Sequence, residues 1–339
     1  MAVRPRCEFE HWITPQSLAL MEMTLFEEWR DHRRTPMRLV LDADSTWGET
    51  HGSQQLTFFN AHYDSYGYHP ILVFDGDTGD LIVAHLRPGN VGASEGIVAW
   101  LEGLVEGIRA KWPDVPILFR ADGGFATPAV YKWCEANGVD FLIGLGTNKR
   151  LAVQSAANLE IAKGQFLSGK VPAGEQAKAF TEFRYKAGTW KRRRRVIAKA
   201  EYGPLGSNQR YVVTSLADRT PRQIYTLYGW RGESENWIKN LKNALAGDRL
   251  SCEDFLPNAF RLLLHAVAYR LCQVLGKVVE RLTGDRRQFD TLRLRLIKIA
   301  ALLVEQGRRV VMHLPRACPY QELWWRTWTA LAPPAASGA

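Results

Sequence analysis

The chain has 339 residues, of which 46% are hydrophobic and 23% charged, enough apolar content for one large or two moderate globular domains. A net charge of +9 and a pI near 9.4 favour polyanionic partners, above all nucleic acid. The five cysteines are odd in number and no two are closely spaced, which argues against a disulfide framework or a zinc site. Reduced thiols in a cytosolic protein are the simplest interpretation.

The most apolar stretch, Phe260–Val279, is interrupted by charged or polar side chains. Arg261, His265, Arg270 and Lys277 make a buried helix a better prediction here than a membrane span. The first residues contain no apolar signal core. We therefore expect a cytoplasmic protein with no membrane partner.

Residues 1–37 are polar and mixed, with an amphipathic helix expected over Ser17–Arg30. In residues 38–148, hydrophobic alternation and turn residues separate strands from helices. Strands are expected at Arg38–Asp44, Gln54–Asn60, Pro70–Phe74, Asp80–Leu86, Pro116–Ala121 and Val139–Leu145, and helices at Ser94–Lys111 and Thr127–Asn137. This order predicts an α/β sheet with a meander at its start.

Residues 149–220 read as a β-rich insertion, and residues 221–315 return to a helical pattern. The insertion strands are expected at Phe180–Tyr185, Trp190–Lys199 and Arg210–Ser215. Helices are then expected over 221–245, 254–282 and Thr291–Gln306, followed by a strand at Val310–Leu314 and a tail over 316–339 whose last residues are small.

Four polar side chains share one stripe of the helix expected near residue 230: Tyr228, Arg231, Glu235 and Lys242. At about 100° per residue they fall within an arc of about 60°. A carboxylate between cations and a phenol suits a metal ligand with phosphate-binding neighbours. An amphipathic helix with intrahelical ion pairs explains the same spacing equally well.

Two further acidic residues lie where strands end, Asp44 and Asp122. Active sites of open α/β sheets form at the carboxyl ends of strands, and a third carboxylate from Glu235 would complete a cage for two divalent cations. Carboxylate oxygens favour Mg²⁺ or Mn²⁺. Either aspartate can instead be a turn or cap residue. Asp42 shares the face of Asp44, which we favour because it is nearer the strand end.

A run of five cations follows Trp190: Lys191, Arg192, Arg193, Arg194 and Arg195. On a strand, alternate members would point to opposite faces. Phosphate contacts and base stacking would suit a distorted DNA end. A solvated basic hairpin with Trp190 packed beneath it is an equally good interpretation.

Together these motifs resemble a DDE transposase of bacterial insertion sequences with the Tyr-Arg-Glu-Lys signature, as in insertion-sequence family thirteen-eighty. The signature is matched without a gap by Tyr228, Arg231, Glu235 and Lys242. LDADST (Leu41–Thr46) and FRADGGFA (Phe119–Ala126) resemble the first and second Asp motifs. Similar blocks lie at His51–Phe74, His85–Asn90, Arg231–Lys242 and Asn258–Tyr269, so the resemblance covers about residues 8–315.

The resemblance implies an RNase H-like mixed sheet flanked by helices, with residues 38–148 and 221–315 as two parts of one catalytic core. The β-rich insertion would precede the Glu-bearing helix, and the C-terminal part would be helical. Asp44, Asp122 and Glu235 would bind two Mg²⁺ or Mn²⁺ ions for cleavage at element ends and strand transfer into target DNA. Tyr228, Arg231 and Lys242 would hold phosphates, and Lys239 and the Trp190–Arg195 run complete the expected DNA-binding set.

The expected partner is double-stranded DNA, both inverted-repeat ends and target, bound by a homodimer near the bacterial nucleoid. Residues 1–37 look like the remnant of an N-terminal DNA-binding region, which suggests a truncated copy. Two alternatives keep the same fold: a metal-dependent nuclease without strand transfer, and a non-catalytic DNA-binding remnant.

Overall fold

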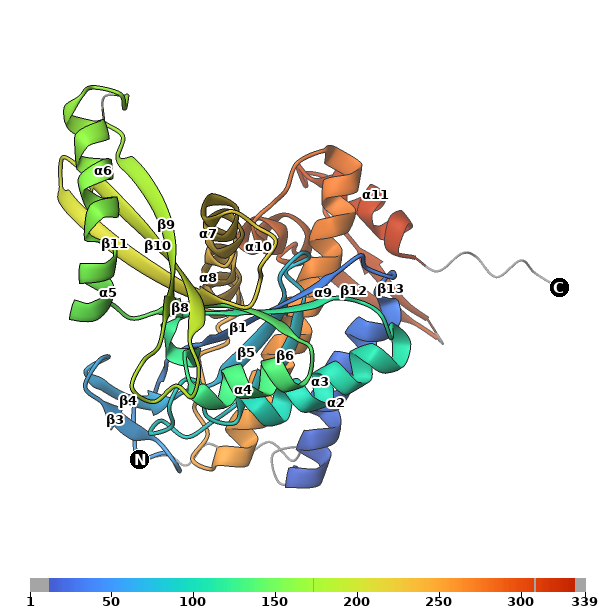
Figure 1. Cartoon of the computed structure of the whole chain (residues 1–339). Helices are drawn as coiled ribbons and strands as arrows, with labels where there is room; N and C mark the ends of the chain where they lie inside the picture. Colours follow the sequence, from blue (N-terminus) through green and yellow to red (C-terminus); the bar gives the residue numbers. More distant parts are fainter. Residues whose placement is uncertain (1–11, 173, 308, 333–339) are drawn as a thin grey trace.

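A computed structural model describes residues 12–172, 174–307 and 309–332 (Figure 1). Its largest feature is an eight-stranded mixed sheet with the order β6-β5-β1-β7-β8-β11-β10-β9. The strands are β1 (Leu39–Ser45), β5 (Ile71–Asp75), β6 (Leu81–His85), β7 (Ile117–Ala121), β8 (Asp140–Leu145), β9 (Ala177–Tyr185), β10 (Arg194–Gly203) and β11 (Gly206–Thr214). Strands β1, β7 and β8 are parallel neighbours, and the remaining pairs are antiparallel.

The two faces of β1 carry different side chains because successive residues alternate. Leu39, Leu41 and Ala43 face a core that α3 (Ile97–Lys111), α4 (Pro128–Ala136) and two aromatic residues of α2 (Pro15–His32) complete. Val40 packs on the opposite face with Ile224 and Leu227 of α7 (Pro221–Gly229). The second face therefore carries Asp42 and Asp44 under the helices that follow the insertion.

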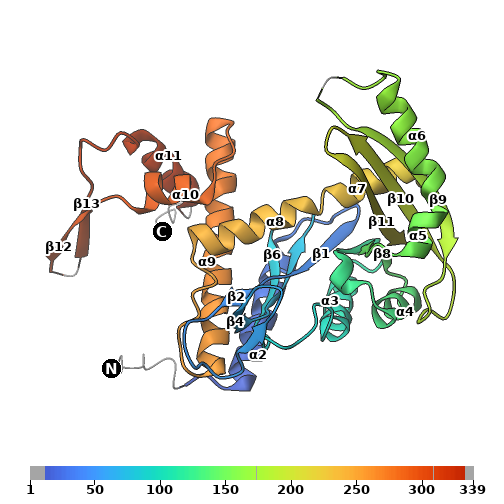
Figure 2. The same cartoon turned by 90° about the vertical axis from the view of Figure 1, so that its left-hand side faces the viewer.

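The helix expected over 221–245 is broken into three segments. Helix α7 ends at Gly229, α8 spans Gly232–Lys239, and a π-helical turn follows at Asn240–Ala244. Gly229 and Gly232 flank the break, and glycine lowers helix stability there. Figure 2 shows α7 and α8 lying across the strands as one bent rod that leads towards α9 (Phe255–Thr283).

By length and composition alone, α9 could cross a membrane, and 39% of its most apolar window is buried. The core helix of a soluble protein meets the same criterion. The inner side of α9 packs beside β6 and α2, with Leu262, Ala266 and Tyr269 fully or almost fully buried. The hydroxyl of Tyr269 donates to the carbonyl oxygen of Gly79 at 3.0 Å. This side of α9 is therefore part of the protein core.

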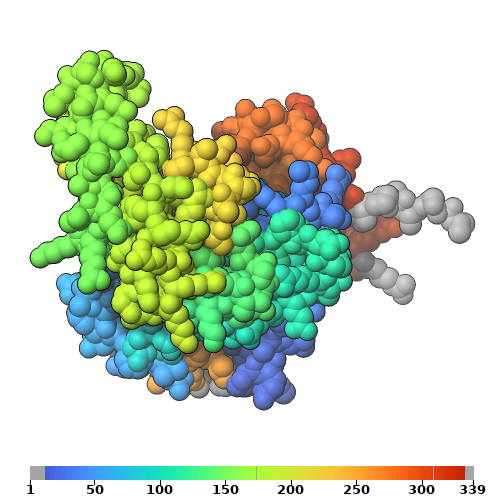
Figure 3. Space-filling model, in the orientation of Figure 1, coloured from blue at the N-terminus to red at the C-terminus, as the bar shows by residue number. Residues whose placement is uncertain are grey.

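The strands of the insertion extend the central sheet, because β11 pairs with β8. Helices α5 (Lys149–Gln154) and α6 (Ala156–Leu167) precede them, and α6 covers β9 and β10. The space-filling view shows this part projecting from the body as an arm (Figure 3). We call residues 149–214 the arm.

Two expected elements near the ends of the core were wrong. The strand predicted over Gln54–Asn60 shortens to β3 (Phe58–Asn60), which joins a small separate sheet with β2 (Gly48–Glu49) and β4 (Ser65–Tyr68). The helix predicted over Thr291–Gln306 is replaced by α10 (Phe289–Leu292), a π-helical turn at Arg293–Ile297 and a hairpin of β12 (Leu302–Gln306) and β13 (Arg309–His313). Gly307, at φ 60°, supplies the left-handed turn that such a hairpin needs.

The segment predicted as a tail contains a helix, α11 (Gln321–Leu331). Leu323 and Trp324 pack against the core that α9 lines, and the Arg326 guanidinium donates to the carbonyl oxygen of Leu282 at 2.8 Å. Apolar side chains at helical spacing therefore dock this segment. Residues 333–339 of the expected tail, and residues 1–11 of the expected N-terminal remnant, lie outside the described residues.

Candidate active site

Asp44 and Asp122 lie side by side because β1 and β7 are parallel neighbours in register. Ala43 pairs with Ala121, and the next residues are Asp44 on β1 and Asp122 directly after β7. The two carboxylates are close enough for each negative charge to matter to the other: Asp122 contributes to a raised pKa of Asp44. The carboxyl edge of the sheet thus carries a pair of acidic groups, Asp44 and Asp122, and we call this place the acidic edge.

The carboxylate of Asp44 is nearly buried, with 12% of the side chain exposed. Burial raises the pKa of Asp44 to about 6, and the neighbouring Asp122 adds to that rise. Arg231 and a hydrogen bond from the Ser234 hydroxyl, at 3.1 Å, act in the opposite direction. Asp44 is therefore a carboxylate whose charge the site only partly compensates.

Asp122 also serves as a local cap. One oxygen of its carboxylate accepts a hydrogen bond from the backbone N–H of Gly124 at 2.9 Å, at the start of a 3₁₀ turn (Gly123–Phe125). A Cβ on Gly124 would approach Ala93 to 2.7 Å. A glycine therefore fits at this position beside Ala93 where a larger residue would not. Asp122 both caps the turn and lies at the acidic edge.

Arg231 links the first and third acidic residues. Its guanidinium lies 3.3 Å from Asp44 and, through the other terminal nitrogen, 3.3 Å from Glu235. The Arg231–Glu235 contact is an intrahelical ion pair of the kind that the alternative interpretation of the stripe requires. Glu235 is 59% exposed on its side chain, so it lies at the rim of the site.

The arrangement fits a hard divalent cation only in part. Asp44 and Asp122 are adjacent carboxylates of the type that Mg²⁺ prefers. Within residues 12–172, 174–307 and 309–332, however, no three acidic, histidine or cysteine side chains come close enough to hold one metal ion. The guanidinium of Arg231 supplies positive charge between Asp44 and Glu235 instead.

Asp42 has a separate, structural role. Two nitrogens of Arg120 donate to its two oxygens, each at 2.6 Å, and the third donates to the carbonyl oxygen of Leu227 at 2.5 Å. Both side chains are fully buried. This bidentate pair joins β1 and β7 to α7, so of the two aspartates on β1 it is Asp44 that faces the candidate site.

Two of the signature residues approach the same edge. The Tyr228 hydroxyl lies over Gly144 at the end of β8, where a Cβ would come within 2.5 Å of it. Burial raises the pKa of Tyr228. Lys242 donates to the carbonyl oxygen of Trp47, in the loop after β1, at 2.6 Å, and burial lowers the pKa of Lys242.

Lys239 does not join them. It lines a different groove, of about 870 Å³, between α8 and α9. Trp230 and Gln273 line the same groove. The structure therefore separates Lys239 from the acidic edge, although it is on the same helix as Glu235.

Sequence reasoning missed two contributors, Ser234 and Tyr63. Tyr63 stacks on Trp47 with the ring centroids 5.0 Å apart and the planes 7° from parallel. Burial raises the pKa of Tyr63, and the negative charges of Asp44 and Asp122 raise it further. A 44% exposed aromatic ring thus lies near both carboxylates. Its only signal was a place in the His51–Phe74 block.

The predicted DNA-stacking role of Trp190 is not supported, because its side chain is 4% exposed. It packs edge-on against Tyr131 and Tyr185, with ring centroids 5.2 and 5.6 Å away. Strand β10 begins only at Arg194, so the strand alternation expected from Trp190 onward was wrong for residues 190–193. Trp190 belongs to the core.

The cations of the run also differ from one another. Arg194 is buried, pairs with Glu135 at 2.8 Å and lies over the Trp190 ring; Arg192 pairs with Glu135 at 2.6 Å. Arg195 pairs with Glu182. These three arginines have acidic partners, Glu135 on α4 or Glu182 on β9, whereas Lys191 and Arg193 are exposed.

Comparison with known proteins places the chain in a family. No curated protein sequence matches it. A solved structure of a piggyBac transposase synaptic complex with hairpin DNA shares 13% sequence identity, with a TM-score of 0.44 over 74% of this chain and 50% of that one. The chain thus spans half the length of that protein. The family described as transposase DDE domain group 1 matches residues 5–335. The chain therefore belongs to the DDE transposase family of group 1.

Proposed function

We propose that the chain cleaves DNA at the ends of an insertion sequence and joins the cut ends to target DNA. The observation that carries the proposal is the adjacency of Asp44 and Asp122 at the ends of parallel β1 and β7, with the helix of Glu235 across them. Membership of the DDE transposase family gives these acids their chemical context. The specific group would be insertion-sequence family thirteen-eighty, on the Tyr-Arg-Glu-Lys spacing.

The strand order supports an RNase H-like core as the scaffold. Strands β6-β5-β1-β7-β8 are an antiparallel meander followed by two parallel additions, and Asp44 lies one residue before the end of β1, the central strand of the five. The arm between β8 and α7 would be the insertion that precedes the Glu-bearing helix. Residues 38–148 and 221–315 would then form one core interrupted by residues 149–220.

Asp44, Asp122 and Glu235 would hold two Mg²⁺ or Mn²⁺ ions, which supply an activated nucleophile and stabilise the leaving oxygen. For Glu235 to join the other two acids, Arg231 has to release at least one of its carboxylates. A guanidinium freed in this way is a bidentate phosphate donor. Tyr228 and Lys242 would hold the phosphates beside the cut, and the exposed ring of Tyr63 would stack on a base there.

The test is cleavage and joining on DNA that carries the sequence flanking the coding region. Wild-type protein with Mg²⁺ should nick this DNA and join it to a target plasmid. Asp44→Asn and Asp122→Asn should abolish both steps but leave DNA binding intact. Cleavage without joining would establish the nuclease alternative, and binding without cleavage would establish the non-catalytic remnant.

The assembly and the location follow from the same proposal. Two copies of the chain would hold the two ends of one element, so we expect a homodimer on double-stranded DNA, near the nucleoid in a bacterial cytoplasm. The molecular mass of the protein in solution, measured with and without a duplex of the end sequence, would test this. A complex of one chain with one end after cleavage would contradict it.

A further inference from the structure

The arm carries a pocket lined by five cations and no acid. Its volume is about 450 Å³. The charged lining consists of Lys149, Arg150, Arg184, Lys186 and Arg193, which we call the arm pocket. In the part of the chain that the structure describes, none of these five side chains has an ion pair or a hydrogen bond. Uncompensated charge of one sign gathered in one hollow is therefore the defining property of this surface.

Neighbouring arginines outside the pocket, unlike the pocket cations, have acidic partners. Arg192, Arg194 and Arg195 are each held by a glutamate, through Glu135 or Glu182. Acids thus pair with these three structural arginines, and neither acid lines the pocket. Cations that only solubilise a surface are interspersed with acids.

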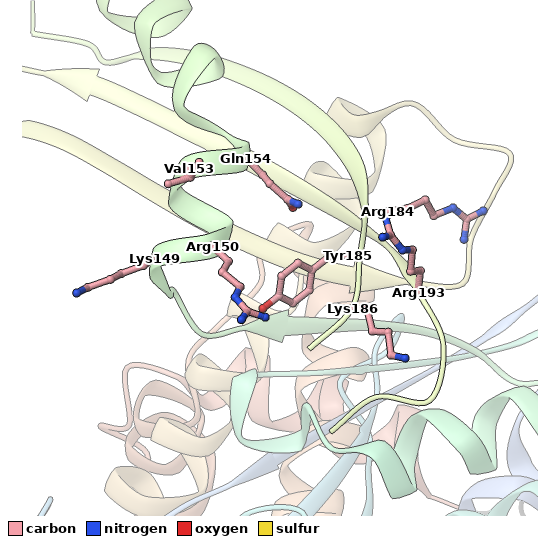
Figure 4. A pocket seen from close by; sticks show the side chains of 8 residues that line it. All are labelled: Lys149, Arg150, Val153, Gln154, Arg184, Tyr185, Lys186 and Arg193. Carbon is pink, nitrogen blue, oxygen red and sulfur yellow. The ribbon is translucent and has the colours of Figure 1, made fainter. Parts of the chain in front are cut away.

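Three different segments converge on the pocket. Arg150 comes from α5, Lys186 follows the last residue of β9, and Arg193 precedes the first residue of β10 (Figure 4). Tyr185 pairs with Arg194 across the hairpin, so Lys186 and Arg193 are the next positions along it. In Figure 4, Arg150 approaches Tyr185 from one side, Lys186 and Arg193 lie on the other, and Lys149 points outward.

The floor of the pocket is fixed by packing. Tyr185 is 6% exposed, its hydroxyl accepts a hydrogen bond from the Asn148 side chain at 3.2 Å, and its ring packs against Trp190. This assigns Trp190 a supporting place behind the pocket. The cations therefore extend from a rigid aromatic base, and their long side chains can adapt to several positions of one ligand.

The pocket is also close to the acidic edge. Gly144, at the end of β8, lies against the Tyr228 hydroxyl and the backbone of Gly123, and Lys149 is in the same chain segment a few residues later. A fully extended chain covers at most about 3.6 Å per residue, so Gly144 beside the acidic edge and Lys149 at the pocket lie less than about 20 Å apart. One turn of a DNA duplex covers about 34 Å.

We propose that the arm pocket binds consecutive backbone phosphates of a DNA duplex within about one helical turn of the bond cut at the acidic edge. The inference rests on the proposed function for the position of the cut, but not for phosphate binding itself. Exposed, flexible cations from three segments match a row of phosphates. A single free phosphate would need donors held at fixed positions around one point.

The experiment measures the affinity of a 30-base-pair duplex of arbitrary sequence over a series of KCl concentrations. The test variant is Arg150→Gln/Lys186→Gln/Arg193→Gln. The matched control is Lys298→Gln/Arg309→Gln/Arg316→Gln, which removes three exposed cations within or near the hairpin of β12 and β13. Figure 2 shows this hairpin at the opposite end of the molecule from the arm. Both variants lose the same net charge, so a difference between them reports position.

Each lost phosphate contact should reduce the slope of log affinity against log salt by about 0.9. The test variant should therefore lose about 2 to 3 from the slope and bind on the order of 10- to 1,000-fold more weakly at low salt, with an unchanged melting temperature. The control variant should keep the wild-type slope. Equal slopes for the two variants would overturn the proposal.

A further titration distinguishes a DNA-binding pocket from a site for small anions. Inorganic phosphate is titrated into wild type and test variant at constant ionic strength. If the variant loses phosphate binding but keeps the wild-type salt slope on DNA, the pocket is a small-anion site and the proposal fails. No step of this experiment requires cleavage, so the result stays interpretable if the proposed catalytic function is wrong. Failure of the pocket proposal likewise leaves the cleavage test interpretable.

Discussion

The guanidinium of Arg231 lies 3.3 Å from the carboxylate of Asp44, although 187 positions separate the two residues. The same guanidinium reaches Glu235, so one cation neutralises parts of two acids that the proposed reaction needs free for metal. A divalent ion bound as proposed would therefore compete with Arg231 for the same negative charge. The metal-free protein is stabilised by a contact that metal binding has to change.

This competition predicts the behaviour of Arg231→Gln. Without metal at pH 7.5, the variant should be less stable than wild type by on the order of 1 to 3 kcal/mol, because nearly buried Asp44 loses its cation. Added Mn²⁺ should then raise the melting temperature of the variant more than that of wild type. Thermal unfolding with and without Mn²⁺ checks both points. Lys239→Gln, at the other end of α8 and lining another groove, is the control.

Glu235→Gln keeps the size of the side chain and removes its charge. Strand cleavage with Mg²⁺ should fall by about two orders of magnitude or more, because a metal cage loses a ligand. Folding should be nearly unchanged, since the side chain is 59% exposed, and DNA binding should survive. Glu233→Gln, which lines the groove between α8 and α9, is the matched control. Equal cleavage by wild type and Glu235→Gln would leave the helix stripe as an ion-pair array.

Asp44 predicts a pH dependence of stability in the metal-free protein. Its pKa rises from an ordinary 3.8 to about 6 on folding, so the folded state binds the proton more tightly than the unfolded state does. Stability is therefore lost as pH rises from about 4 through about 6, and the loss is complete above that range. Asp44→Asn removes this dependence.

The measurement compares the free energy of unfolding of wild type and Asp44→Asn at pH 5 and pH 8. The advantage of the variant should grow by on the order of 1 kcal/mol between the two pH values. Added Mg²⁺ at pH 8 should close the gap by stabilising only the wild type. A gap that is the same at both pH values would mean that Asp44 titrates normally.

Trp190→Ala should act on stability and not directly on DNA contact. Removing a side chain that is 4% exposed and packed on two tyrosines should cost about 3–5 kcal/mol. Trp190→Phe should cost less because it keeps an aromatic ring there. Trp230→Ala, at a residue that is 53% exposed, is the surface control and should be close to neutral. Chemical denaturation of the three variants gives the ranking. A Trp190→Ala variant with the same free energy of unfolding as wild type would show that Trp190 does not stabilise the core.

The central strands and the two aspartates could be predicted because their signals are local. Short apolar runs between turn residues, such as Ile71–Phe74, indicate strands, and an acid at the end of a strand is a candidate site residue. The pairing of Asp42 with Arg120 could not be predicted, because the partner comes from another strand 78 positions away. The same limit hid Ser234, whose hydroxyl reaches Asp44 only after α8 crosses the sheet.

The arrangement of the Trp190–Arg195 run could be predicted only in part, for a different physical reason. Charge patterns along a sequence do not show which cations will meet an acid in the fold. Glu135 on α4 pairs with both Arg192 and Arg194, and no local feature of the run predicts these pairs. The helix predicted over Thr291–Gln306 failed because leucines and a valine suit both periodicities, and only Gly307 marks the hairpin.

The pairing of β11 with β8 has a consequence for how DNA length would be measured. Four residue pairs, from Tyr211 with Leu145 to Thr214 with Leu142, join the arm to the strand that carries Gly144 beneath Tyr228. The arm and the acidic edge cannot move apart without breaking this ladder. If DNA is bound at the arm and cut at the acidic edge as proposed, backbone hydrogen bonds would fix the number of base pairs between the two sites, whatever the sequence of the DNA between them.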